Sequence, residues 1–130
     1  MKKLQVGAQY LLGLIFFVFG LNGFLGFLPM PPMPEAAGAF MGGLAGAGYF
    51  FPFLKAFEVL CGLALLTNRF VPLALLILSP IVVNILLFHV FLAPAGGAVG
   101  YLAFVLVVVN LFAYKGHFNS TLVAKAVRDE

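Results

Sequence analysis

The residues best suited to chemistry are Lys55 and Glu58, three positions apart in an otherwise apolar stretch, FFPFLKAFEVLCGLALL at 50–66. Positions three apart are neighbours on a helix, so this ammonium and this carboxylate can form an ion pair. A charged side chain at the centre of a membrane-spanning helix costs about 2.5–3.5 kcal/mol on insertion scales, which makes such residues rare. The stretch therefore holds either a structural ion pair or part of a ligand-binding site.

The composition indicates what kind of element must hold this pair. The 130-residue chain has 64% hydrophobic and 8% charged residues and a mean hydropathy of +1.16, whereas a soluble domain has about 25% charged residues. So few charges cannot cover a soluble surface, and the sequence predicts an integral membrane protein with room for about four spans of roughly 20 residues. The net charge of +3 then concerns membrane topology, and we expect no nucleic-acid partner.

Four apolar segments bounded by helix-breaking residues are the predicted spans. They cover about residues 4–24, 51–66, 70–92 and 97–114. The connections at 67–69 and 93–97 are short enough to make antiparallel helix hairpins. The sequence thus predicts an all-α fold: an integral membrane antiparallel four-helix bundle in one domain over residues 1–115, with a cytoplasmic tail at 116–130.

A longer connection joins the first two spans. Its proline cluster favours extended backbone and consists of Pro29, Pro31, Pro32 and Pro34. Residues Glu35–Leu44 then predict a short helix, with Glu35 near the positive end of the helix dipole. Because this helix is mostly apolar, we expect it to lie at the membrane interface between spans one and two.

The basic residues predict the orientation of the chain. With four spans both termini share one side, and six of the seven basic residues fall there: Lys2, Lys3, Arg69, Lys115, Lys125 and Arg128. The positive-inside rule then places both termini in the cytoplasm. The two lysines before an apolar core are also typical of a signal peptide. The apolar run is longer than such a core, however, so we expect a retained first span.

Counting the helical rise of 1.5 Å per residue gives each polar side chain a depth. Lys55 and Glu58 lie roughly 5 Å and 9 Å below the outer boundary, and His89 and Asn84 roughly 4–5 Å and 12 Å below it. Asn22 ends the first span on the same side, whereas Asn110 lies near the cytoplasmic end. We predict a polar pocket in the outer half of the bilayer, lined by Asn22, Lys55, Glu58, Asn84 and His89.

Two structural interpretations compete with the pocket. Lys55 and Glu58 can simply neutralise each other while Lys55 extends to the head groups. The amides and the imidazole can form a clamp between helices, with about 0.6–1.7 kcal/mol for each hydrogen bond. Asn84 and His89 also lie five positions apart, about 140° around a regular helix, so both face the bundle only if Pro80 or a tilt turns them inward.

Several chemistries are excluded by residue count. Cys61 is the single cysteine, which leaves no internal disulfide or dithiol pair. His89 and His117 fall at opposite ends of the predicted bundle, about 30 Å apart, so they cannot ligate one haem within a chain. No catalytic triad, metal-ligand cluster or phosphate loop is recognisable, and we assign no catalytic and no metal-binding residue.

The stretches LLGLIFFVFGLNGFLGFLPMPPMPEAAGAFMGGL and GYFFPFLKAFEVLCGLALLTNRFVPLALLILSPIVVNILLFHVFLAP resemble the DoxX-like family of small four-span bacterial membrane proteins. The resemblance covers about residues 11–94. It implies a bacterial inner (plasma) membrane location and association with quinone-linked oxidoreductase systems. The family pattern has a basic residue at Gly23 and a histidine at Gly26, so the resemblance leaves open whether this chain is an enzyme.

Three functions follow from the sequence. The first is an accessory or quinone-binding subunit of a membrane oxidoreductase system, in which Glu58 and His89 exchange protons with a quinone that Lys55 and Asn84 orient. The second is a small proton-coupled transporter that uses Glu58. The third is a purely structural or assembly subunit. The expected partners are the lipid bilayer, oxidoreductase subunits and a homo-oligomer, and the expected cofactor is a quinone alone.

Overall fold

The computed structural model describes residues 2–29 and 32–129, and these residues form helices and connections without a strand. The elements are α1 (Lys2–Leu25), α2 (Glu35–Gly46), α3 (Phe50–Leu66), α4 (Val71–Leu92) and α5 (Ala98–Ala113), with 3-10 helices η1 (Pro94–Gly96) and η2 (Lys115–Thr121). The predicted all-α fold is confirmed. Of the predicted proline cluster, Pro31 lies outside the described residues.

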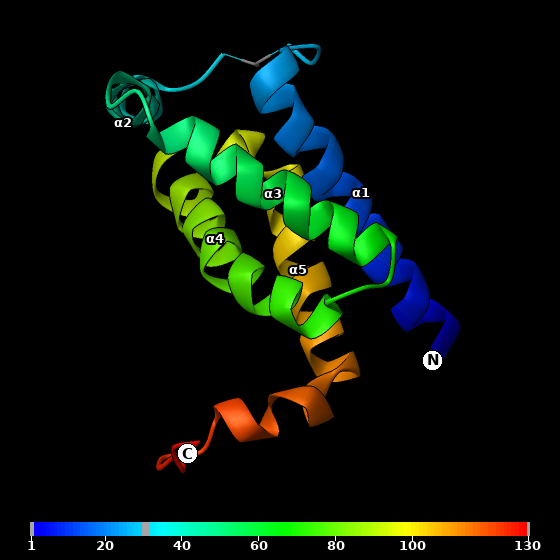
Figure 1. Ribbon diagram of the computed structural model, residues 1–130. Helices are drawn as coiled ribbons and strands as arrows, with labels where there is room; N and C mark the ends of the chain where they lie inside the picture. Colours follow the sequence, from blue (N-terminus) through cyan, green and yellow to red (C-terminus); the bar gives the residue numbers. More distant parts are fainter. Residues whose placement is uncertain (1, 30–31, 130) are drawn as a thin grey trace.

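The four long helices pack side by side and alternate in direction (Figure 1). α1 packs on α3 and α5, and α4 packs on the same two helices, so the contacts close a ring around one core. The end of α1 that carries the N-terminus and the end of α5 that leads to the C-terminus both point downward in Figure 1. The bundle therefore has a terminal end, which holds both chain ends and the α3–α4 turn, and an opposite end near α2.

Two to four of the helical segments are long and apolar enough to cross a membrane. α1 and α4 meet this requirement alone, and two bent pairs meet it together: α2 with α3, at 93°, and α5 with η2, at 81°. α3 has 17 residues and α5 has 16, so each is somewhat shorter than the roughly 20 residues of a typical span. The membrane character predicted from the composition is thus supported by the helices themselves.

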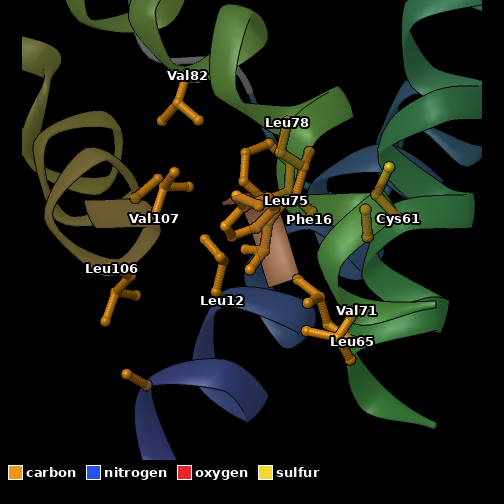
Figure 2. Packing of buried hydrophobic residues seen from close by; sticks show 14 residues of the cluster. Leu12, Phe16, Cys61, Leu65, Val71, Leu75, Leu78, Val82, Leu106 and Val107 are labelled. Carbon is orange, nitrogen blue, oxygen red and sulfur yellow. The ribbon is translucent and has the colours of Figure 1, made fainter. Parts of the chain in front are cut away.

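The core is a layer of branched apolar side chains at the centre of the ring. Leu12, Leu65, Leu75 and Leu78 are fully buried, and Figure 2 shows Leu75 and Leu78 of α4 next to Phe16 of α1. Many large apolar side chains also lie on the outer surface of every long helix. An apolar exterior of this extent suits lipid rather than water, because lipid removes the need for a polar surface.

Glycines bring the backbones of α1 and α3 into contact. A Cβ atom on Gly62 would lie 2.5 Å from the Phe17 nitrogen and 2.9 Å from the Gly13 carbonyl oxygen. A Cβ atom on Gly13 would lie 2.9 Å from the Leu65 Cβ atom. Small residues let spanning helices approach this closely. We call Gly13, Gly20, Gly23 and Gly62 the glycine seam.

The short helix predicted after the proline cluster is confirmed, and α2 extends it from the expected Leu44 to Gly46. It lies across the ends of α3 and α4, which it contacts, and Figure 1 shows it nearly end-on beside the start of α3. Ala37 is fully buried there, and the Phe40 ring lies 5.7 Å from the Phe88 ring. Its position at the end of the bundle is the one an interfacial helix would take.

We predict that Gly62→Ala weakens the bundle, because its methyl group would collide with the backbone of α1. Overpacking of a dense interface lowers the free energy of unfolding by about 1–3 kcal/mol. Thermal unfolding of the detergent-solubilised protein, followed by circular dichroism, measures the effect. Gly43→Ala in α2 is the matched control, since no atom of the described residues lies within 4 Å of its added methyl group. Equal melting temperatures for the two variants would contradict a close α1–α3 contact.

Candidate functional site

The predicted ion pair is present. Lys55 Nζ lies 3.2 Å from Glu58 Oε1 and donates a hydrogen bond to it. The Glu58 side chain is buried, with 4% of its surface exposed, whereas the Lys55 side chain keeps 24% exposed. The carboxylate is therefore enclosed by the bundle while the ammonium reaches its surface.

The glycine seam makes room for this pair. A Cβ atom on Gly20 would lie 3.1 Å from the Glu58 Cβ atom. A Cβ atom on Gly23 would overlap the Lys55 Cγ atom, so the aliphatic part of Lys55 covers Gly23. Removing one partner of a buried ion pair costs about 3–5 kcal/mol, because the other charge is left without compensation. The pair and the seam are thus one structural unit joining α1 to α3.

Asn22 is close in sequence to this unit, but its side chain has a structural partner. The Leu28 N–H donates to Asn22 Oδ1 at 2.6 Å, and the Gly26 N–H donates to the Asn22 carbonyl oxygen at 2.8 Å. Gly26 has a φ of +64°, a conformation that glycine adopts without steric cost. Asn22 and Gly26 together end α1 and turn the chain toward α2.

Asn84 and His89 lie on different sides of α4. The Asn84 side chain is exposed on the outer face of the helix. His89 Nδ1 lies 3.2 Å from the Ala93 carbonyl oxygen, and its ring packs against Tyr101 and over Gly100 of α5. The five predicted residues thus do not share one contact set: Lys55 and Glu58 meet, Asn22 caps α1, and His89 packs on α5.

Two open grooves in the described residues lie elsewhere. One, of about 200 Å³, is an apolar groove between α3 and α4 that includes Leu60, Cys61, Ala64 and Leu73. The other, of about 210 Å³, lies between α1 and α5 at the terminal end, beside Gln9 and Tyr114. A binding role for the five predicted residues stays a prediction.

A polar cluster that the sequence analysis missed joins three helices at the terminal end. Buried Gln9 of α1 donates through Nε2 to the Leu65 carbonyl oxygen and to Asn68 Oδ1, each at 3.0 Å. The Tyr114 hydroxyl donates to Gln9 Oε1. We call Gln9, Asn68, Tyr114 and the Leu65 carbonyl group the Gln9 cluster. Its one sequence signal is an amide within the first apolar segment, and its partners are 56 to 105 positions away.

Asn110 is the second buried amide near this end of the bundle. Its side chain is fully buried, and Nδ2 donates to the Leu106 carbonyl oxygen at 2.7 Å. Within the described residues Oδ1 has no hydrogen-bond partner. This bond runs to the preceding turn of its own helix, one of the local side chain–backbone bonds that an asparagine side chain can form.

Comparisons with known proteins do not assign the chain to a class. No model of a known protein family matches it, and searches of curated proteins and of solved structures gave no match. The resemblance to the DoxX-like family therefore stays a prediction from the residues quoted above.

We predict that Gln9→Leu lowers the free energy of unfolding by about 1–3 kcal/mol, the cost of leaving buried partners unsatisfied. Tyr114→Phe removes only one of the three bonds and should cost less. A double-mutant cycle in detergent separates their coupling from their individual effects. Because Gln9 and Tyr114 share a hydrogen bond, the double variant should be less destabilised than the sum of the two single variants. Strict additivity would show that Gln9 and Tyr114 do not interact.

Proposed function

We propose that this chain is an accessory membrane subunit of an oxidoreductase system and binds a quinone head group at the Lys55–Glu58 pair. The observation that carries the proposal is an ion pair with one buried and one accessible partner. Glu58 is enclosed between α1 and α3, and Lys55 keeps a quarter of its side chain exposed. An intramembrane charge of this kind is by default a candidate for function.

The chemistry of the pair suits a quinone. An ammonium group has three hydrogens, and Glu58 Oε1 accepts one of them, so a quinone carbonyl can accept another. The carboxylate beside it is an acceptor that can take up or release a proton when the quinone changes its redox state. Electrons would come from a partner subunit, and the link to an oxidoreductase rests on the resemblance to the DoxX-like family.

The proposal includes the setting of the site. We place four spans in the bacterial plasma membrane with both termini in the cytoplasm, which puts the Lys55 end of α3 at the outer face. The support is the excess of basic residues at the terminal end and the positive-inside rule. α2 then lies at the outer interface beside the site, and an isoprenoid tail extends along the apolar outer surface of the helices.

A purely structural role is the second candidate, and a specific observation favours it. The pair is already neutral, the Glu58 Cβ atom packs against Gly20, and the aliphatic part of Lys55 covers Gly23. All of these contacts hold α1 against α3 and need no ligand. The two functions differ in one measurable respect. Only the quinone-binding function predicts that the protein loses bound quinone when Lys55 is replaced.

The test is Lys55→Gln in the full-length chain purified from native membranes. Quinone retained per protein is measured by mass spectrometry. Loss of a charge-assisted hydrogen bond is expected to lower retention about tenfold or more. Lys115→Gln, at the terminal end, is the control and should retain the wild-type amount. Wild-type protein without quinone, or equal quinone in both variants, would exclude the binding function and leave the structural one.

A further inference from the structure

The apolar groove between α3 and α4 has a shape and an exposure that suit a lipid chain. Small side chains at Ala64 and Ala74 leave it open, and Phe70 and Ile77 are among its walls. Leu60 is 62% exposed and Leu73 is 55% exposed, so the groove faces outward. In a bundle embedded in a membrane, the outward side is hydrocarbon, and an acyl chain is the molecule available to fill the groove.

One end of the groove reaches the α3–α4 turn. The Arg69 N–H donates to the carbonyl oxygen of Ala64 at 2.9 Å, and Phe70 follows Arg69 directly in the chain. Ala64 and Phe70 both line the groove. The exposed Arg69 side chain therefore starts at the point where an acyl chain in the groove would join its head group.

The same turn contains a second hydrogen-bond donor, the side-chain amide of Asn68, which belongs to the Gln9 cluster. Gln9 Nε2 donates to Asn68 Oδ1, so the amide NH₂ group of Asn68 is directed away from Gln9. Asn68 has a φ of +56°, a left-handed conformation that asparagine tolerates better than most residues. The turn thus has two consecutive exposed residues, Asn68 and Arg69, whose side chains carry an amide donor and a guanidinium.

Charge at this end favours an anionic partner. No acidic residue occurs between Glu58 and Asp129, and Glu58 is enclosed in its ion pair. Within the described residues, α4 and α5, which follow Arg69 in the chain, therefore carry no carboxylate that could pair with it. A guanidinium binds a phosphate group in two parallel hydrogen bonds.

We infer that the α3–α4 hairpin binds an anionic phospholipid, with one acyl chain in the groove and the phosphate group at Arg69 and Asn68. The acyl chain is surrounded by hydrocarbon whether it is bound or free, so the groove contributes little to the choice between lipids. The groove therefore sets where the acyl chain lies, and the head group sets which lipid binds. This site lies at the terminal end of the bundle and shares no residue with the proposed quinone site. The two are therefore tested separately.

The experiment is a native mass-spectrometry titration of the full-length protein with phosphatidylglycerol and phosphatidylcholine of identical chains. We expect phosphatidylglycerol to bind about fivefold more tightly, the contribution of about one basic side chain at a lipid surface. Arg69→Gln should remove this preference and Arg69→Lys should keep most of it. Arg128→Gln, in the tail, is the control and should leave the preference unchanged. Equal affinity of wild-type protein for both lipids, or a preference that survives Arg69→Gln, would overturn the inference.

A second measurement locates the bound acyl chain on the surface of the protein. Phosphatidylglycerol with a photoreactive group in the acyl chain is bound, irradiated and mapped by peptide mass spectrometry. Labelling should be enriched at Leu60 and Leu73 over Val105 and Phe112, which are comparably exposed on α5. Arg69→Gln should abolish the enrichment. Labelling spread evenly over the two pairs would show that the groove holds no preferred lipid.

Discussion

The close approach of α1 and α3 is the contact on which the rest of the bundle depends. Lipid is as apolar as the side chains it surrounds, so spanning helices gain little from hiding apolar surface from each other. They associate through van der Waals contact and through polar groups that find partners inside the protein. The glycine seam supplies the first, since Gly62 meets the backbone of α1 directly. The polar groups, which are the Lys55–Glu58 pair and the Gln9 cluster, lie at the two ends of the seam.

Each end of the α1–α3 interface carries polar side chains, and at the terminal end these bond from one helix to the other. At the end near α2, the Lys55–Glu58 pair lies over Gly20 and Gly23. At the terminal end, Gln9 bonds to the last turn of α3, to the α3–α4 turn and to Tyr114. Between these ends the core is almost entirely aliphatic. These contacts fix the register of the helices, because sliding α1 along α3 by one turn would break the Gln9 hydrogen bonds and move Gly20 and Gly23 away from Glu58 and Lys55.

The same arrangement separates two candidate functions in space. The ion pair combines a buried carboxylate with an accessible ammonium, as a site for a polar head group requires. The α3–α4 turn instead combines Arg69 with an amide oriented by Gln9, next to an apolar groove. A bundle of this size can thus present one surface to ligands at the α2 end and another to anionic lipid at the terminal end.

The sequence predicts well where the helices begin and end. It predicts poorly which side of each helix faces the other helices. Hydropathy and the breakers at Pro52, Pro72 and Gly97 locate the four long helices to within about two residues of α1, α3, α4 and α5, and Glu35 marks the start of α2. The Lys55–Glu58 pair is also predictable, because it depends only on spacing within one helix. These features are local, which is why a single sequence contains them.

The remaining features depend on which helix faces which. α4 is apolar on all sides, so its sequence does not show that Asn84 is turned outward while His89 packs on α5. Gln9 is similarly ambiguous, since its partners come from the end of α3 and from Tyr114. Asn22 was expected to line a pocket, yet the turn formed with Gly26 uses its side-chain oxygen. In each case tertiary packing, rather than depth in the membrane, decides the role of the polar group.

The most direct test of the account is a disulfide across the seam. Gly13→Cys and Leu65→Cys are combined in a Cys61→Ala background. These two Cβ positions lie 2.9 Å apart, so a local shift of about 1 Å brings them to the roughly 3.5–4.5 Å separation of a disulfide. Mild oxidation in native membranes, followed by counting of the remaining thiols by mass spectrometry, should show near-complete pairing within one chain. Gly7→Cys with Leu65→Cys should remain reduced, because in the part of the chain that the structure describes no atom lies within 4 Å of a Cβ atom at Gly7. Equal oxidation of both pairs, or none in the first, would contradict the α1–α3 contact.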